Sequence, residues 1–243
     1  MRHTVVVSSA RFGANYFVRA CQCSVENMKF VGEIFRKGSD GRRYMAQLLS
    51  TDEISVASLA AKDPASLWAR AKSKSHQGAL IAKLYYYHQP EESSLWTELA
   101  GGEDHVIHMI RRNLFDAYVS REIAVKFDMW GSKGNGLDRD QIRGVVIPEE
   151  EVIKFIEDRS FEISRTRAMF LDHSHYHEVF FEDICLAPEL AVSVVEAIFG
   201  KASLKEKIKI SKDFRDGRVK NFSNASTILN YEDICYLDRY HID

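Results

Sequence analysis

Residues 5–20 read VVVSSARFGANYFVRA, and this stretch decides the fold of the chain. Its β-branched start is typical of a buried strand, while Gly13 and Asn15 are typical of a short loop that opens a helix. The start of a helix presents N–H groups and a partial positive charge, so phosphate binds there readily. The stretch therefore predicts a strand, an anion-binding loop containing Arg11, and a helix. The alternative is a plain strand-turn-helix whose arginine is solvated.

A second stretch, IRRNLFDAYVS at residues 110–120, repeats this pattern about a hundred residues later. If its helix begins near Asn113, Ser120 lies about two turns in, roughly 11 Å along the helix axis. Arg112, eight positions before Ser120, could then share an anion with the serine hydroxyl through paired hydrogen bonds. Alternatively, Arg112 pairs with Asp116 and Ser120 is an ordinary surface residue. The two stretches together predict two anion sites at one edge of a sheet.

Length and composition favour one globular domain over residues 1–243, with a loop insertion around 131–147 and a basic segment around 205–224. The 33 Lys and Arg residues nearly balance the 35 Asp and Glu residues, which argues against a nucleic-acid binder. No apolar segment is long enough for a signal peptide or a membrane anchor. The four cysteines form no CxxC pair and are expected to be free thiols, which favours a reducing, cytoplasmic compartment.

Continuous apolar runs alternate with helical patterns, which predicts a three-layer α/β fold with a mainly parallel central sheet flanked by helices. The predicted strands are His3–Ser8, Phe30–Gly32, Gly78–Tyr87, His105–Ile110 and Tyr176–Phe181. The predicted helices are Asn15–Met28, Asp52–Lys74, Asn113–Trp130, Pro148–Leu171 and Pro188–Phe199.

Two features limit the choice of chemistry. The first loop lacks the Gly-Lys-Ser/Thr sequence of a Walker A motif, which argues against ordinary ATP-driven phosphoryl transfer. His173, His175 and His177 would share one face of an extended segment, a spacing that can chelate zinc. No acidic or cysteine partner at a recognised spacing accompanies them, so we expect no metal site.

The order of these motifs resembles the PAPS-dependent sulfotransferases (PAPS is 3′-phosphoadenosine 5′-phosphosulfate). ARFGANYF stands at the family's 5′-phosphosulfate loop, and RRNLFDAYVS matches its 3′-phosphate motif. VFFEDI at 179–184 and GRVKNFSNAS at 217–226 resemble its later segments. VGEIF at 31–35 and KLYYYH at 83–88 are most similar to bacterial carbohydrate sulfotransferases of the nodulation-factor and trehalose type.

The resemblance implies a P-loop-like fold that takes PAPS as donor and releases PAP (3′-phosphoadenosine 5′-phosphate), with no metal. Where the family favours hydroxyl side chains after the loop glycine, this chain has Ala14, Asn15 and Tyr16, and Phe12 is bulky for its place. Arg215, Arg218 and Lys220 could complete the 3′-phosphate pocket or simply keep a surface loop soluble. The expected nucleotide-binding residues are Arg11, Phe12, Gly13, Ala14, Asn15, Tyr16, Arg112, Ser120, Arg215 and Arg218.

The same resemblance implies a sulfuryl transfer to a hydroxyl of a carbohydrate or glycolipid. Glu33 matches the family's proposed general base, with a pKa expected to be raised by partial burial; the alternative is a surface glutamate. His88, at the end of a predicted strand, is an alternative base, a substrate contact or a plain strand-end histidine. Lys83 lies inside that strand, where a lysine is seldom buried without a partner. It resembles a lysine that recurs in the bacterial members, so Lys83 is expected at the substrate site with Glu33 and His88. Arg11 is also expected at the reacting group.

Two rival functions stay open. One is a nucleotide-dependent kinase with an atypical phosphate loop, which would bind ATP and magnesium. The other is a catalytically inactive homologue that binds nucleotide or glycan, as suggested by Phe12 and Ala14. Neither the acceptor nor the oligomeric state can be read from the residues, and a homodimer is one allowed assembly.

Overall fold

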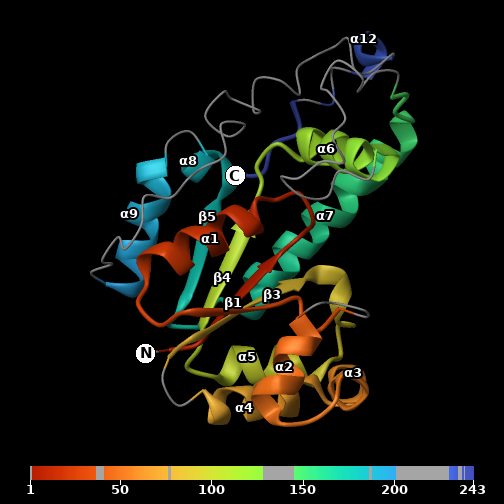
Figure 1. Ribbon diagram of the computed structural model, residues 1–243. Helices are drawn as coiled ribbons and strands as arrows, with labels where there is room; N and C mark the ends of the chain where they lie inside the picture. The colour runs from red at the N-terminus through yellow and green to blue at the C-terminus, as the bar shows by residue number, and fades with distance from the viewer. Residues whose placement is uncertain are drawn as a thin grey trace.

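A computed structural model describes residues 2–36, 41–75, 78–127, 145–185, 188–200, 230–234, 237 and 239–243. Its centre is a five-stranded sheet in the order β2-β3-β1-β4-β5, in which every pairing between neighbouring strands is parallel (Figure 1). The strands are β1 (Thr4–Ser8), β2 (Lys29–Gly32), β3 (Leu80–Tyr85), β4 (His105–Ile110) and β5 (Tyr176–Phe180).

Helices cover both faces of the sheet, as the continuous apolar strands require. Val6 of β1 packs into a core with α1 and α9, while Val5 and Val7 face the opposite core, to which α2 to α7 contribute. The predicted α/β fold with a parallel sheet is therefore confirmed. The helices include α1 (Ala14–Ser24), α2 (Gly41–Leu49), α3 (Glu53–Lys62), α4 (Pro64–Lys74), α5 (Ser94–Gly101), α6 (Leu114–Phe127), α7 (Glu149–Met169), α8 (Phe181–Cys185), α9 (Pro188–Phe199) and α12 (Tyr231–Ile234).

Local chemistry explains where the predicted elements were wrong. The single helix expected over Asp52–Lys74 is two helices, because Pro64 takes the first position of α4 and Asp63 caps it by accepting from the Ser66 amide at 3.1 Å. The strand expected over Gly78–Tyr87 is shorter, since the chain turns into a 3₁₀ helix, η1 (Tyr86–His88), after β3. Helices α2, α5 and α8 were not predicted.

None of the described helices combines the length and the apolar character that a membrane span requires. Cys21 and Cys23 of α1 are free thiols, as predicted, and burial raises the pKa of the Cys21 thiol above its ordinary value. The side chains of Cys185 and Cys235 lie outside the described residues. So do the segment 131–144 and the basic segment 205–224, including Arg215, Arg218 and Lys220.

Candidate functional site

The loop after β1 makes a tight reversal at the carboxyl edge of the sheet. Gly13 has φ +90°, and a Cβ atom there would lie 2.3 Å from Cδ2 of Phe181, so only glycine fits without strain. Arg11 also has positive φ, at +70°. The Ser8 hydroxyl donates to the Met109 carbonyl at 3.0 Å, which joins this loop to the end of β4. The two predicted anion loops therefore lie side by side.

Burial divides the six loop residues that were expected to bind nucleotide. The side chain of Phe12 is fully buried in the core, and those of Ala14 and Tyr16 are also buried. These three side chains anchor the loop in the hydrophobic cores, and the bulky Phe12 is accommodated because it is part of the core. Among the residues after Gly13, only Asn15 is exposed at the first turn of α1. An anion at this turn would meet backbone N–H groups and the Asn15 amide rather than hydroxyls.

Arg11, and not Arg112, contacts Ser120. The Arg11 Nε donates to the Ser120 Oγ at 2.9 Å, and Ser120 is buried rather than a surface residue. Arg11, which has positive φ, therefore links the first loop to α6. The expectation that Arg112 and Ser120 share a bound anion stays a prediction.

Arg112 lies at the end of β4 against β5. Its two Nη atoms donate to both carboxylate oxygens of Asp183, the second at 3.0 Å, and its guanidinium carbon lies 3.8 Å from the Phe180 ring centre. The hydrogen bonds that Arg112 donates to Asp183 raise the pKa of Arg112. The alternative pairing of Arg112 with Asp116 is wrong, because Arg111, a buried neighbour, takes Asp116 at 3.3 Å.

A buried ion pair links Glu33, the residue after β2, to Lys83 inside β3. Lys83 Nζ donates to the Glu33 Oε1 at 2.8 Å and also to the Asn15 side-chain oxygen. The lysine side chain is 5% exposed, so these partners account for its burial inside a strand. Glu33 also accepts from Arg36 at 3.3 Å. This cluster joins the expected base to the first turn of α1.

The pKa of Glu33 differs from the expectation. Burial by itself raises this pKa, but the hydrogen bond and charge of Lys83, assisted by Arg36, outweigh it and hold the pKa below its ordinary value. The expected rise is therefore wrong. Glu33 is ionised at neutral pH, so it can accept a proton, though as a weaker base than an unpaired carboxylate in the same position.

His88 lies beside Glu33, with its Nε2 atom 3.9 Å from the Glu33 Oε2. Its Nδ1 accepts from the Tyr85 amide at 3.2 Å, which assigns the proton of the neutral ring to Nε2. Burial lowers the pKa of His88 to about 4, although Glu33 opposes this. The Nε2 atom is buried without a hydrogen-bond partner in the described part of the chain.

Buried histidines make stability depend on pH. Burial lowers the pKa of His88 from 6.5 to about 4. Unfolding restores the ordinary pKa, so between these two values the unfolded chain binds more protons and stability falls as the pH falls. We expect His88 alone to lower the free energy of unfolding by about 2 kcal/mol between pH 7 and pH 5. Urea unfolding at both pH values measures this, and His88→Gln should remove that part of the dependence. Wild-type pH dependence in the variant would contradict it.

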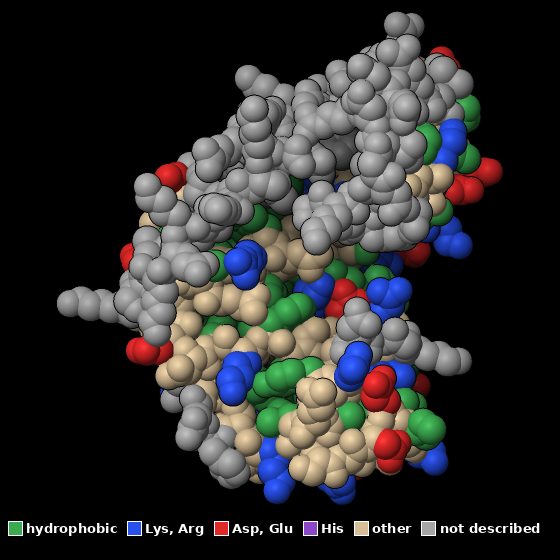
Figure 2. All heavy atoms as spheres, viewed as in Figure 1, with side chains coloured by type: hydrophobic (Ala, Val, Ile, Leu, Met, Phe, Trp, Pro, Cys, Tyr) green, Lys and Arg blue, Asp and Glu red, His purple; other side chains and the backbone are tan. Residues whose placement is uncertain are grey.

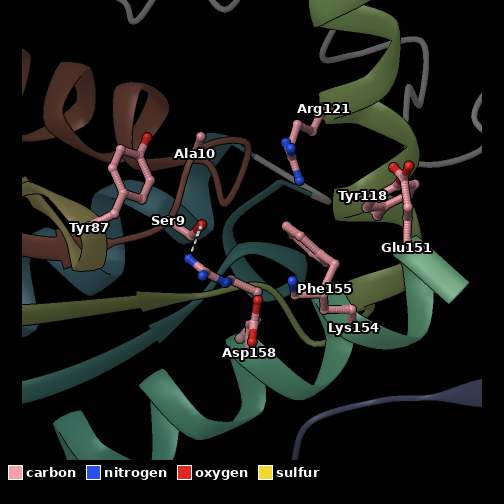
Figure 3. Close-up of a pocket in the computed structure, with 10 residues that line it drawn as sticks. Ser9, Ala10, Tyr87, Tyr118, Arg121, Glu151, Lys154, Phe155 and Asp158 are labelled. Carbon is pink, nitrogen blue, oxygen red and sulfur yellow. Dashed lines mark hydrogen bonds between the residues drawn. The ribbon is translucent and has the colours of Figure 1, made fainter.

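A pocket of about 630 Å³ opens beside the first loop (Figure 3). It lies between Tyr87 of η1 and helices α6 and α7, and Arg159 reaches across it to donate to the Ser9 hydroxyl at 3.4 Å. Figure 2 shows Lys, Arg, Asp and Glu side chains gathered near the middle of the viewed face, with hydrophobic side chains beside them. The lining residues are Ser9, Ala10, Tyr87, Tyr118, Arg121, Glu151, Lys154, Phe155, Asp158 and Arg159.

Sequence reasoning missed this pocket, although part of its signal is present. Its five α7 residues lie at positions 151, 154, 155, 158 and 159, a spacing that places them on one face of a helix. Four of them are charged, which by itself reads as a solvated face. Only the fold shows that this face of α7 lies opposite the first loop, at Ser9 and Ala10. Glu182, which accepts from the backbone amides of Arg112 and Asn113, was likewise missed as a contributor to the site.

The histidine-rich segment packs against β4. His105 Nδ1 lies 3.3 Å from His177 Nε2, and the rings of His105 and His175 are 5.4 Å apart. Within the residues that the structure describes, no group of three or more His, Cys, Asp or Glu side chains has a metal-binding arrangement.

Comparison with known proteins gives a likeness of fold only. No family model matches the chain, and no curated protein matches it. The structure resembles a sulfotransferase domain from the curacin biosynthetic pathway, with a TM-score of 0.51 and 13% identity over 100% of this chain and 88% of that chain. A sulfotransferase domain from the Synechococcus PCC 7002 olefin synthase has a TM-score of 0.48 and 14% identity, over 98% of this chain and 86% of that one. A sulfotransferase from Alicyclobacillus acidocaldarius has a TM-score of 0.47 and 14% identity, over 97% and 96%. Together with the parallel sheet and its edge loops, the first of these likenesses shows that the chain has a sulfotransferase-like fold.

Proposed function

We propose that the protein is a sulfotransferase that moves a sulfuryl group from PAPS to a hydroxyl of a carbohydrate or glycolipid. The observation that carries this proposal is the hydrogen bond that Arg11, in the loop before α1, donates to Ser120 of α6. It joins the loop expected to hold a 5′-phosphosulfate to the helix expected to hold a 3′-phosphate. The sulfotransferase-like fold supports the same donor.

The donor site fits a nucleotide with phosphate at both ends. On the 5′ side, Gly13 lets the loop pack tightly against Phe181, and the N–H groups of the first turn of α1 and the Asn15 side chain supply donors. Arg11 adds a charge on that side and Ser120 a hydroxyl on the other, while Arg112 adds a guanidinium with the geometry to bind phosphate through two hydrogen bonds. Each hydrogen bond to a charged group contributes about 1.5–3 kcal/mol.

The reaction needs placement, charge stabilisation and removal of one proton. By analogy with phosphoryl transfer, the acceptor oxygen attacks the sulfur in line as the bond between sulfur and the 5′-phosphate oxygen breaks, and PAP leaves. Glu33, ionised at neutral pH, takes the proton of the attacking hydroxyl. Lys83 balances the charge of Glu33 before transfer, and His88 lies beside the base, with its Nε2 atom 3.9 Å from the Glu33 Oε2. Arg11 stabilises charge on the peripheral oxygens.

The pocket beside the loop supports a carbohydrate acceptor. Tyr87 is exposed and offers an aromatic face, and the carboxylates and guanidinium groups of the pocket can pair with several hydroxyls. Tyr118 already donates to Glu151 at 2.9 Å, which holds that carboxylate in the pocket wall. We further infer a cytoplasmic location, where free thiols such as Cys21 stay reduced.

Transfer of labelled sulfate tests the proposal. Incubation of the full chain with ³⁵S-labelled PAPS and a panel of mono-, di- and lipo-oligosaccharides should label at least one acceptor without added magnesium. Parallel incubation with γ-³²P-labelled ATP and magnesium tests the kinase alternative. Labelling from ATP and not from PAPS would contradict the proposal. Tight binding of PAP with no labelled acceptor would favour the inactive alternative.

A further inference from the structure

The corner between β5 and α8, residues 180–183 (FFED), touches both halves of the proposed donor site. Its first phenylalanine lies 3.8 Å under the guanidinium of Arg112, and its second fills the space where a side chain on Gly13 would stand. The same second ring lies 4.8 Å from the guanidinium carbon of Arg111. Gly13, Arg111 and Arg112 therefore all contact one short segment, which we call the FFED corner.

The FFED corner fixes the backbone that carries Arg112. Glu182 accepts from the Arg112 amide at 3.0 Å and from the Asn113 amide at 3.2 Å. On the other side, the Ile242 amide donates to the Arg112 carbonyl at 3.0 Å. With these bonds and the stacking on Phe180, Arg112 is held in position by contacts that do not involve Asp183.

Asp183 makes a different kind of contact. Its carboxylate takes both Nη atoms of Arg112, which form an edge of a guanidinium that binds a carboxylate or a phosphate through two parallel bonds. The Asp183 side chain is 54% exposed, so it can turn into solvent without moving the backbone. A phosphate on that edge would also meet the negative charge of Asp183, since the two anions would share one cation.

We propose that Asp183 competes with the 3′-phosphate of the nucleotide for Arg112, and so sets how strongly the site discriminates 3′-phosphorylated from plain adenine nucleotides. The inference rests on the proposed function. Contacts with Glu182, Ile242 and Phe180 fix the position of Arg112. The 3′-phosphate then displaces the Asp183 carboxylate from the Arg112 guanidinium. Exposed ion pairs are weak, so the competition should cost about two- to fivefold in affinity. The same exchange would ease release of PAP.

Calorimetric titration with PAP and with AMP tests this inference. Asp183→Asn keeps the size of the side chain and removes its charge; it should bind PAP about two- to fivefold more tightly and leave AMP affinity unchanged. Asp183→Ser serves as a second variant with the same expectation. Glu189→Gln, an exposed charge removal on α9, is the matched control and should change neither affinity. In an Arg112→Gln background, Asp183→Asn should have no effect on PAP.

The outcomes separate the two claims. Equal affinity of the wild-type protein for PAP and AMP would overturn the proposed function. A wild-type preference for PAP, with PAP affinity in both Asp183 variants unchanged or weaker, would overturn this inference alone. An equal gain in Glu189→Gln would also overturn it, because the effect would then be one of net charge and not of the pair with Arg112.

Discussion

Replacing Glu33 with Gln is expected to lower kcat of sulfuryl transfer by about a hundredfold or more, with PAP affinity within about twofold of wild type. Glutamine keeps an oxygen that can accept the hydrogen bond from Lys83, now 2.8 Å from the Glu33 Oε1, so the cluster should stay assembled. What it loses is an ionised carboxylate that can take a proton. Initial rates with labelled PAPS and calorimetry with PAP measure the two quantities separately.

The control for this variant is Glu53→Gln, which removes an exposed carboxylate at the start of α3. Its kcat should equal that of wild type. If Glu33→Gln also turns over at the wild-type rate, Glu33 is not the base. A loss of PAP affinity equal to the loss of kcat would instead assign Glu33 to the assembly of the donor site.

Replacing Gly13 with Ala is the second large effect. The new Cβ would lie 2.3 Å from Phe181 Cδ2 and 3.3 Å from Met109 Cε, in a backbone conformation with φ +90°. A non-glycine residue in this region costs about 1–2 kcal/mol before any clash. Because the loop must shift to relieve the contact, we expect PAP affinity to fall at least about tenfold and the free energy of unfolding to fall by about 1–3 kcal/mol.

Gly101→Ala is the matched substitution, since a Cβ at Gly101 in α5 meets no atom within 4 Å. It should leave PAP affinity unchanged and stability unchanged or slightly higher. Urea unfolding and calorimetry on both variants make the comparison. Wild-type binding and stability in Gly13→Ala would show that the loop accommodates a side chain, and the tight reversal described for this loop would be wrong.

The sheet was predictable because its strands are continuous apolar runs that no other arrangement buries. All five strands fall within or close to their predicted ranges, and Val5, Val6 and Val7 fill both cores. The helices on the β2–β3 side were harder. Helices α2 and α5 are short, so their sequence patterns are weak. The break between α3 and α4 depends on one proline and one capping residue, a local signal that the long helical pattern of residues 52–74 obscured.

The site was predictable as a set of residues and less so as a set of contacts. Lys83, Glu33 and His88 come together as expected, because the carboxyl ends of parallel strands meet at one edge. The partner of Ser120 was not predictable, since Arg11 lies 109 positions earlier in the chain and its positive φ is uncommon in arginine. The low pKa of Glu33 depends on its contact with Lys83, which lies on the neighbouring strand.

The corner at Phe180–Asp183 shows the same limit. Its sequence was recognised as similar to a segment of the family. Its role, however, depends on two contacts with Arg112: Glu182 accepts from the backbone amide and Asp183 accepts from the guanidinium. Residues 131–144, Arg215 and Arg218 lie outside the described residues, so their expected roles stay predictions.

The claim on which the whole account depends is that one edge of the sheet holds both ends of a doubly phosphorylated adenosine. The most direct measurement is the calorimetric affinity of the wild-type protein for PAP beside AMP, and beside ATP with magnesium. We expect PAP to bind at least about tenfold more tightly than AMP, the contribution of one charge-assisted phosphate contact. Equal affinities for PAP and AMP, or tighter binding of magnesium ATP, would contradict the account.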